Sequence, residues 1–284
     1  MCKIFITRIH HCNGVNYKMQ NKILSLKNLK KVYSSRAGDI LAIKDISVDV
    51  YDKSFLSIVG PSGCGKSTLL KLVAGIIPKS GGEIILRGKP VEGPQKDIGM
   101  VFQYPTLLDW KKILDNIMLP VKVLKLDKKN YLPRAHGLLK LTGLAGFEGR
   151  YPYELSGGMQ QRVSICRALV HNPSLLLMDE PFGSLDAMTR NVMDLELLRI
   201  WDEEKKTVLF VTHDILEAVF LADYVLALSC RPSEVMEVLK VDLPRPRKPI
   251  MRASKKFYNF VDRISKKLRI DETSILSEQG SEGE

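Results

Sequence analysis

The chain has 284 residues, of which 45% are hydrophobic, and it carries a formal net charge of +11 at pH 7. This length suggests one large domain or two intimately packed domains with a sizeable apolar core. No apolar run reaches the roughly 18 residues that a membrane span needs, and the N-terminal apolar stretch is too short for a signal peptide, so we expect a cytoplasmic chain.

The N-terminal residues show no periodic pattern before about residue 22. An alternation of apolar and polar residues that is typical of a strand then begins at Ile23, and a second strand is predicted near 43–50. Tyr33 lies between these strands, in a predicted polar turn. We therefore interpret residues 1–21 as an arm outside the fold, either disordered or absent from the mature protein.

A phosphate-binding loop follows the short apolar strand predicted at 55–59, and a helix is predicted from Thr68 to Ala74. The glycines of such a loop let backbone N–H groups turn toward phosphates, and the helix N-terminus adds a positive dipole end. Lys66 can reach the terminal phosphates, and the Ser67 hydroxyl can ligate Mg²⁺. A nucleoside triphosphate is therefore expected on this loop, which consists of Gly60, Pro61, Ser62, Gly63, Cys64, Gly65, Lys66, Ser67 and Thr68.

Two further strands are predicted at 83–86 and 96–102, and the second ends at Gln103. The pattern then becomes helical, which indicates a helical subdomain of about residues 105–158 inserted into a core of strands and helices. Prolines and glycines are expected to break its helices, at Pro120, Pro133, Gly143 and Gly146.

The next part of the chain alternates apolar strands with helices, which predicts an α/β fold with a mostly parallel sheet covered on both faces. Asp179 and Glu180 end one of these strands. A carboxylate there can hold Mg²⁺ against Ser67 and leave Glu180 to orient a water molecule, although a helix N-cap explains such a pair equally well. The strands are predicted at 174–178, 207–212 and 224–228, and the helices at 188–205 and 215–222.

Most of the positive charge lies in the C-terminal part, because eleven Lys or Arg stand against two Asp between Lys240 and Ile270. A basic segment with few aromatic residues favours a solvated face or a contact with anionic lipid, so we expect no nucleic-acid partner. The acidic tail from Asp271 to Glu284 is predicted to be disordered. We interpret residues 231–284 as a basic extension that ends in this tail.

The cysteines do not predict a disulfide framework, because their number is odd and they are scattered. A metal cluster formed by Cys2, His10, His11 and Cys12 is not expected either, because the spacing is not that of a zinc site. Cys64 is the exception of chemical interest: the amides and Lys66 around it should lower the pKa of its thiol and make it reactive. The five cysteines are Cys2, Cys12, Cys64, Cys166 and Cys230.

Three further motifs follow the phosphate loop, and with them the sequence resembles the ATP-binding subunits of ABC transporters over residues 22–230. Singly, Tyr33, Gln103 and His213 each fit ordinary structural roles, but the order of all the elements favours the functional interpretation. The resemblance implies an ATPase core, an antiparallel β subdomain near the N-terminus and a helical subdomain that carries the signature. The motifs are Leu155-Ser156-Gly157-Gly158, Ser184-Leu185-Asp186 and Thr212-His213-Asp214.

The resemblance also implies a homodimer of ATPase subunits that binds ATP between the phosphate loop of one subunit and the signature of the other. Its implied roles are adenine stacking by Tyr33, Mg²⁺ binding by Ser67, Gln103 and Asp179, general-base action by Glu180 and a γ-phosphate contact from His213. Catalysis would involve Glu180, His213 and Gln103. Nucleotide contacts are further implied for the phosphate loop with Lys66, and for Ser156, Gly157, Gly158 and Asp186.

Within the family, residues 101–110 and the segment Asp242–Arg247 look like those of the nitrate, sulfonate and taurine importers, although Asp109 replaces their usual proline. The partners implied are integral-membrane permease subunits and, indirectly, a solute-binding protein, with the ATPase peripheral on the cytoplasmic face of the membrane. Importers of thiamine-precursor pyrimidines share the pattern. A soluble ABC ATPase of translation or DNA repair and a small-molecule kinase remain as alternatives, and the signature together with His213 argues against the kinase.

Overall fold

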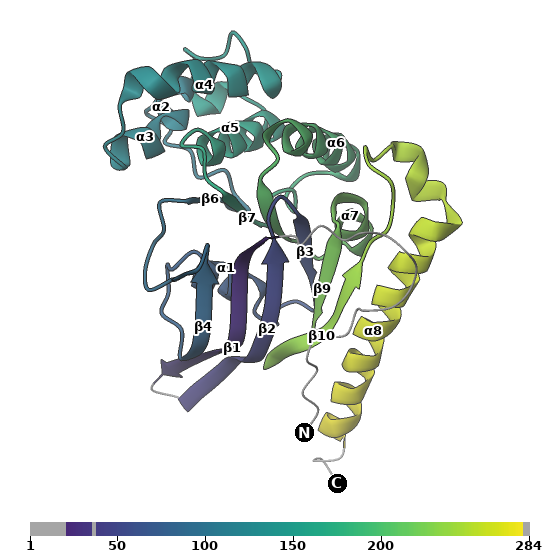
Figure 1. Ribbon diagram of the computed structural model, residues 1–284. Helices are drawn as coiled ribbons and strands as arrows, with labels where there is room; N and C mark the ends of the chain where they lie inside the picture. Colours follow the sequence, from purple (N-terminus) through teal and green to yellow (C-terminus); the bar gives the residue numbers. More distant parts are fainter. Residues whose placement is uncertain (1–20, 36–37, 281–284) are drawn as a thin grey trace.

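The computed structural model describes residues 21–35 and 38–280, with the backbone alone for 270–280 (Figure 1). Ten strands form one sheet in the order β5-β4-β1-β2-β10-β9-β3-β8-β7-β6. The N-terminal part is antiparallel: β1 (Lys22–Ser35), β2 (Gly38–Tyr51), β4 (Gly81–Leu86) and β5 (Lys89–Pro90). The other part is parallel: β3 (Phe55–Val59), β6 (Ile98–Val101), β7 (Leu175–Asp179), β8 (Thr207–Val211) and β9 (Tyr224–Leu228).

The parallel strands are apolar because both of their faces are covered. Strand β3 is buried at every position. Its alternate residues enter different clusters: Phe55 and Val59 pack with the larger helical layer, whereas Leu56 and Ile58 pack with the layer that contains α1 (Lys66–Val73). This arrangement confirms the α/β class, with a mostly parallel core and an antiparallel N-terminal part.

The helices of the inserted region gather at the top of Figure 1, beyond the carboxyl edge of the parallel strands. They are α2 (Ile113–Ile117), α3 (Leu119–Val123) and α4 (Lys128–Leu141), followed by the 3₁₀ turn η1 (Pro152–Glu154) and α5 (Gly157–Leu169). Along the chain, helix α6 (Ala187–Glu204) connects β7 to β8, and helix α7 (Ile215–Leu221) connects β8 to β9.

The predicted break at Pro120 is confirmed: α2 ends at Ile117, and Pro120 lies in the first turn of a new helix, α3, where the backbone N–H has no intrahelical partner to lose. The predicted break at Pro133 was wrong. Pro133 lies inside α4, and the buried side chains of Ala135, Leu138 and Leu139 on the same helix offset its missing hydrogen bond. Tyr33 is also corrected, since it belongs to β1 and not to a turn.

Sequence analysis missed β10 (Ser233–Lys240), which joins the two parts of the sheet. It pairs antiparallel with β9 and, at Ser233 and Glu234, parallel with β2. Most of its residues are half-buried and do not alternate, so no strand pattern marks them. The basic extension therefore contributes a strand to the core sheet.

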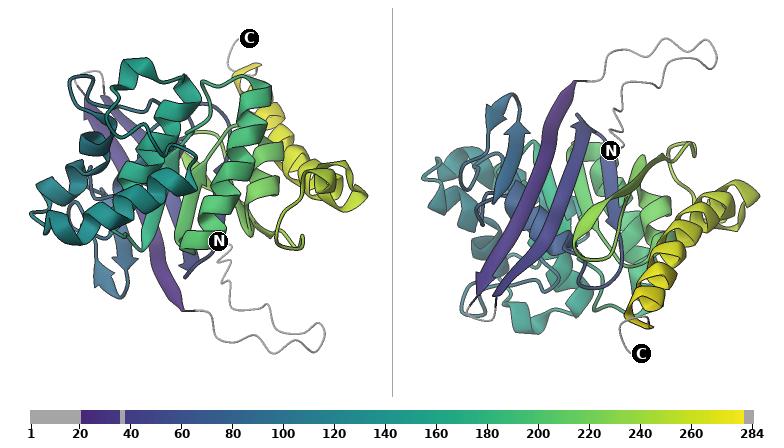
Figure 2. Two further views of the ribbon diagram at one scale, coloured as in Figure 1. Left: turned by 90° about the horizontal axis from the view of Figure 1, so that it is seen from above. Right: turned by 90° about the horizontal axis from the view of Figure 1, so that it is seen from below.

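The 3₁₀ turn η2 (Pro249–Ala253) and the helix α8 (Lys255–Gly280) complete the chain. Figure 2 shows α8 on the opposite side of the molecule from α2–α4. Phe257 and Ile264 on α8 are buried, with Val261 and Leu268 packed against the core on the same face. Residues 271–280, which we expected to be disordered, continue this helix because adding turns to a packed helix costs little.

Several expectations fall on residues that the structure leaves out. The N-terminal arm up to residue 20, the cluster of Cys2, His10, His11 and Cys12, and residues 281–284 lie outside the described part. Among the described helices, none is long and apolar enough to cross a membrane.

Candidate active site

The phosphate loop joins β3 to α1, and its glycines are required by its backbone. Gly63 and Gly65 have φ values of +75° and +112°, a region that L side chains rarely adopt. A Cβ on Gly60 would lie 2.9 Å from the carbonyl oxygen of Leu228. The loop therefore follows a path that only glycine permits at these positions, which leaves its backbone N–H groups near the start of α1.

Lys66 lies inside the loop, with 5% of its surface exposed. Its Nζ donates to the carbonyl oxygens of Gly60 at 2.9 Å and Pro61 at 3.0 Å. An ammonium group has three N–H donors, so these bonds hold the charge in place and leave one donor for an anion. A phosphate at the loop would meet a cation that is already positioned.

Ser67 connects the loop to the end of β7, two strands from β3 in the sheet, because its Oγ donates to Oδ1 of Asp179 at 2.8 Å. Burial raises the pKa of Asp179; the bond from Ser67 opposes this effect, and the negative charge of Glu180 adds to it. A half-buried carboxylate with few compensating charges and an adjacent hydroxyl is a set of hard oxygen ligands that suits Mg²⁺. The residues present therefore fit the predicted ion.

Glu180, His213 and Gln103 converge beside this pair. Nδ1 of His213 lies 3.2 Å from Oε2 of Glu180. A Cβ built on Gly183 would lie 3.5 Å from Nε2 of Gln103 and 3.6 Å from Oε2 of Glu180. The amide of Gln103 and the carboxylate of Glu180 therefore both lie beside Gly183. The three side chains follow β6, β7 and β8, whose carboxyl ends share one edge of the sheet.

The backbone of Glu180 is held in an uncommon conformation, with φ at +44°. Its N–H donates to the carbonyl oxygen of Val211 at 3.0 Å, and its own carbonyl accepts from the N–H of Gly183 at 3.1 Å. These bonds fix the direction of the side chain toward His213. A strained and over-determined residue of this kind is typical of catalytic positions.

Tyr33 lies next to the phosphate loop, with its hydroxyl 3.4 Å from Oγ1 of Thr68. The ring is 40% exposed, and Nζ of Lys31 lies 4.8 Å from its centroid. A half-exposed ring at this position offers a face to a flat ligand. The structure thus brings Tyr33 to the loop, and its predicted stacking on adenine stays a prediction.

The prediction of a reactive thiol in the loop was wrong for the folded state. Cys64 is 1% exposed, and its side chain packs in the cluster beneath the loop. Its Sγ lies 3.0 Å from the position of a Cβ on Gly60. A phosphate can therefore meet the backbone of Cys64 and not its thiol, and the side chain fills the space under the turn.

The signature segment lies on a different part of the surface from the phosphate loop, at the start of α5. Ser156 caps this helix by accepting from the N–H of Met159 at 3.4 Å, and both Ser156 and Gly157 are exposed. The neighbour of Gly157 is Leu185, on the segment leading into α6, and the neighbours of Gly158 are Thr189 and Met193 in the first turns of α6. The signature is thus built together with this segment, and its donors face outward.

Asp186 caps α6, because its Oδ1 accepts from the N–H groups of Met188 and Thr189, both at 3.0 Å. The Thr189 hydroxyl donates to its other oxygen at 2.6 Å and, together with these amides, lowers the pKa of Asp186. Its carboxylate therefore has a structural role in this chain. A nucleotide contact of Asp186 stays a prediction.

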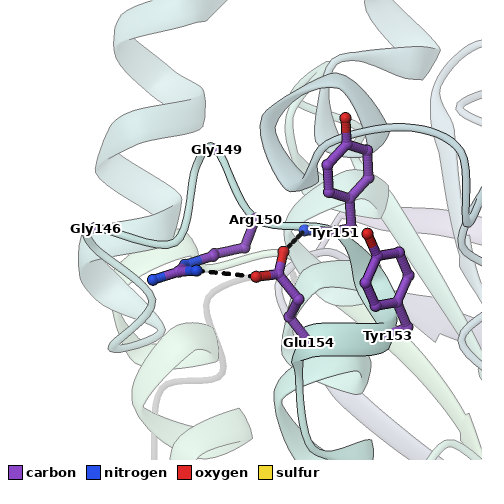
Figure 3. Close-up of a pocket in the computed structure, with 6 residues that line it drawn as sticks. All are labelled: Gly146, Gly149, Arg150, Tyr151, Tyr153 and Glu154. Carbon is purple, nitrogen blue, oxygen red and sulfur yellow. Dashed lines mark hydrogen bonds and ion pairs between the residues drawn. The ribbon is translucent and has the colours of Figure 1, made fainter.

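An open hollow of about 540 Å³ lies beside the signature (Figure 3). The rings of Tyr151 and Tyr153 stack there with centroids 5.6 Å apart, and Arg150 donates to Oε1 of Glu154 at 2.9 Å. Its remaining lining residues are glycines, Gly146 and Gly149. None of these residues belongs to the phosphate loop, so the hollow is separate from the catalytic edge of the sheet.

Sequence reasoning missed a residue that connects two of the motifs. Arg190 on α6 donates to the carbonyl oxygen of Leu185 at 3.2 Å, and its Nη1 lies 3.6 Å from Oδ2 of Asp214. It therefore links the segment before α6 to the segment that carries His213. An arginine on a helix carries no spacing signal of its own, and only the fold places it between these segments.

The family model described as ABC transporter matches residues 43–183 of this chain. The taurine import ATP-binding protein TauB of Escherichia coli K12 is 48% identical over 204 residues, which cover 72% of this chain and 80% of that protein. TauB of Rhizobium johnstonii is 46% identical over 224 residues, covering 78% and 86%. An uncharacterised ABC transporter ATP-binding protein of Methanocaldococcus jannaschii is 47% identical over 224 residues, covering 79% and 84%.

Solved structures agree with the sequence comparisons. A dimeric ATP-binding cassette in a post-hydrolysis state, bound to ADP and Pi, superposes with a TM-score of 0.67 at 32% identity. The match covers 78% of this chain and all of that one. A cassette from Clostridium perfringens that is part of an ABC transporter complex gives a TM-score of 0.68 at 27% identity, covering 78% of this chain and 90% of that one.

Proposed function

The chain belongs to the ATP-binding proteins of ABC transporters and is an ATPase subunit, and we propose that it powers the import of a small sulfonate such as taurine. The observation that carries the choice of solute is the identity of 46–48% with proteins named for taurine import. The motif pattern around residues 101–110 and 242–247 supports the same group. Nitrate and other sulfonates are the nearest alternatives in substrate chemistry.

In the proposed site, the phosphate loop and Lys66 bind the phosphates of ATP and Tyr33 stacks on the base. Ser67, Gln103 and Asp179 would hold Mg²⁺, which would supply charge neutralisation for the phosphates. Glu180 orients the attacking water and accepts its proton. His213, whose Nδ1 lies 3.2 Å from Glu180, keeps that carboxylate in place and faces the γ-phosphate with its other nitrogen.

We propose that two copies form the hydrolytic unit, each supplying its signature to the ATP held by the other. The exposure of Ser156 and Gly157 supports this arrangement, because the N-terminus of α5 presents anion-binding donors outward. A two-fold symmetric pairing satisfies both signatures at once. The dimeric cassette to which the fold is similar gives the same support.

The proposed membrane partner is a separate permease, with this subunit peripheral on the cytoplasmic face. The segment after Gln103 supports a docking site there, since Tyr104 is 66% and Trp110 75% exposed. Leu107 and Leu108 are half-buried, and Leu107 packs against the core. These two residues therefore attach the segment after Gln103 to the rest of the fold. Exposed aromatic residues of this kind are typical anchors of interfaces.

Transport by a complex of this chain with its proposed permease tests the proposal. We expect ATP-dependent uptake of taurine into vesicles and loss of that uptake when Tyr104→Glu is introduced, with the ATPase rate of the isolated subunit unchanged. Tyr258→Glu is the matched control, because Tyr258 is a 56% exposed tyrosine on α8.

Uptake of a thiamine-precursor pyrimidine in place of taurine would contradict the proposed solute but support the proposed role as an importer subunit. Absence of any permease that co-purifies with the wild-type chain would favour a non-transport ABC ATPase. Uptake that survives Tyr104→Glu would place the docking site on another surface.

A further inference from the structure

Two acidic side chains, Asp194 on α6 and Glu217 on α7, are buried together beneath the segment that carries His213. Asp194 is 1% and Glu217 5% exposed. Oδ1 of Asp194 and Oε1 of Glu217 meet no ordinary donor within the described part of the chain. The two carboxyl groups do approach each other within hydrogen-bonding range, so one proton held between them satisfies both.

The surrounding charges decide which group carries that proton. Arg252 on η2 donates to Oδ2 of Asp194 at 2.5 Å and lies 4.0 Å above the ring of Phe220, which favours the ionised form of Asp194. Burial is the main reason that the pKa of Glu217 rises to about 8 and that of Asp194 to about 6, and the charge of Asp194 raises Glu217 further. At neutral pH Glu217 therefore donates and Asp194 accepts.

The remaining charged groups near the pair do not reverse this order. Asp214, at the start of α7, raises both pKa values further, and its charge is balanced by Arg190 at 3.6 Å. Arg245 and Arg247 bind carbonyl oxygens at the other end of α7. His213 lies in the loop before α7 and contacts Glu180, on the far side of that loop.

Glu217 is also bonded to the loop that carries His213. Its backbone N–H donates to Oδ1 of Asp214 at 3.2 Å, and Oγ1 of Thr212 accepts from the N–H of Asp214 at 3.0 Å. The Thr212 N–H donates to the carbonyl oxygen of Ile58 at 3.2 Å, which ties the loop to the strand before the phosphate loop. His213 stands between two residues that this bonding holds.

We propose that Glu217 is a positioning residue for ATP hydrolysis, which keeps the Thr212–Asp214 loop, and with it His213, in place only while the carboxyl pair holds its proton. This inference rests on the proposed role of His213. Loss of the proton leaves two adjacent buried carboxylates, whose repulsion moves Glu217 and the start of α7 away from Asp194. Hydrolysis should therefore fall on the alkaline side for a reason that lies outside the nucleotide site.

The test is the pH profile of ATP hydrolysis by the full chain, for the wild type, Glu217→Gln and Glu217→Ala. We expect the wild-type kcat to fall above about pH 8, and Glu217→Gln to keep its rate there, because the amide donates to Asp194 and cannot lose a charge. Glu217→Ala should lower kcat about 10- to 100-fold at every pH while KM changes less than about twofold. Glu196→Gln, on α6 and paired with Arg199, is the matched control and should behave as the wild type.

An alkaline fall in Glu217→Gln equal to that of the wild type would overturn the role of the proton, and a wild-type kcat in Glu217→Ala would overturn the positioning role. If Glu217→Ala does not fold, the Gln variant still decides, because it preserves the shape of the side chain and can donate to Asp194. His213→Ala separates the two proposals: full activity in that variant would refute the proposed role of His213, whereas a large loss would leave only Glu217 under test.

Discussion

The phosphate loop and the signature segment share a local plan, a glycine-containing turn that runs into a helix N-terminus, but their surroundings differ. α1 starts inside the core, where Lys66 is 5% exposed and held by two carbonyl oxygens of its own loop. α5 starts at the exposed Ser156, which caps its own helix with a long hydrogen bond of 3.4 Å. One anion-binding end is completed within the chain, and the other faces outward.

This difference indicates that the phosphate loop and the signature have separate roles in the ATPase. The loop can hold ATP in a single subunit because its donors, its lysine and Asp179 are all positioned by strands β3 and β7. In the proposed dimer, the signature acts on a phosphate that the other subunit presents to it. Variants at the two places should therefore separate binding of ATP from its hydrolysis, and four predictions follow in order of expected effect.

The largest effect is expected from Lys66→Ala. The loss of the one buried cation of the loop should lower the hydrolysis rate about 10²- to 10³-fold and weaken ATP binding at the same time. Fluorescent-nucleotide titration and a phosphate-release assay measure the two quantities. Lys71→Ala, an exposed lysine on the same helix, is the control and should lose neither.

Glu180→Gln, a change beside the phosphate loop, should separate ATP binding from ATP hydrolysis. The amide keeps the shape of the side chain and cannot accept a proton, so ATP should still bind while hydrolysis slows by roughly 10²-fold or more. Trapped ATP should stabilise the dimer in size-exclusion chromatography. Monomers alone, at concentrations well above those that saturate ATP binding, would contradict the proposed pairing.

Ser156→Ala should leave ATP binding by the monomer unchanged and lower hydrolysis about tenfold, with dimer formation reduced, because in the proposed dimer its hydroxyl faces the partner. The variant also loses a helix cap, which is worth about 1 kcal/mol. Asp127→Ala removes the equivalent cap of α4, where Asp127 accepts from Lys129 at 3.0 Å, and controls for this loss. Equal activity in both variants would remove the signature from the reaction.

The smallest effect concerns stability and the pair of Asp194 and Glu217. Burial raises the pKa of Glu217 to about 8 in the folded chain, whereas the pKa of an unfolded glutamate is near its ordinary value of 4.5. The folded state therefore binds more protons in this window, and its stability should fall as pH rises from about 4.5 to 8. Each pH unit costs about 1.4 kcal/mol at most.

Urea unfolding at pH 5 to 8 measures this loss, and Glu217→Gln should show a flatter dependence than the wild type. Glu196→Gln again serves as the control. A wild-type stability that rises throughout this window relative to the Gln variant would mean that Glu217 is ionised in the folded chain.

Much of the catalytic edge could be predicted because its motifs are contiguous. The phosphate loop needs particular glycines and a lysine at fixed spacing, and strands such as 55–59 are apolar because both of their faces are covered. Asp179, Glu180 and His213 end neighbouring strands of a parallel sheet, so their order along the chain already indicated a common edge. The structure brings all of these residues together as expected.

Other features depend on contacts between distant segments, for which the local pattern carries no signal. The sequence suggested a reactive Cys64, but the packing beneath the loop buries its thiol. It marked Pro133 as a helix break, but the buried face of α4 holds that helix together.

The sequence by itself determined the chemistry of the nucleotide site, because a phosphate loop is a local arrangement of backbone donors that its glycines and lysine specify. Only the tertiary structure decided that Asp194 and Glu217 share a buried site and that Arg252, from the basic C-terminal part, neutralises it. The physical reason is that burial and pairing of charges depend on which helices pack together. From the sequence alone, Glu217 has the pattern of a solvated helix residue. Once it is buried beside Asp194, it is a group that holds its proton at neutral pH.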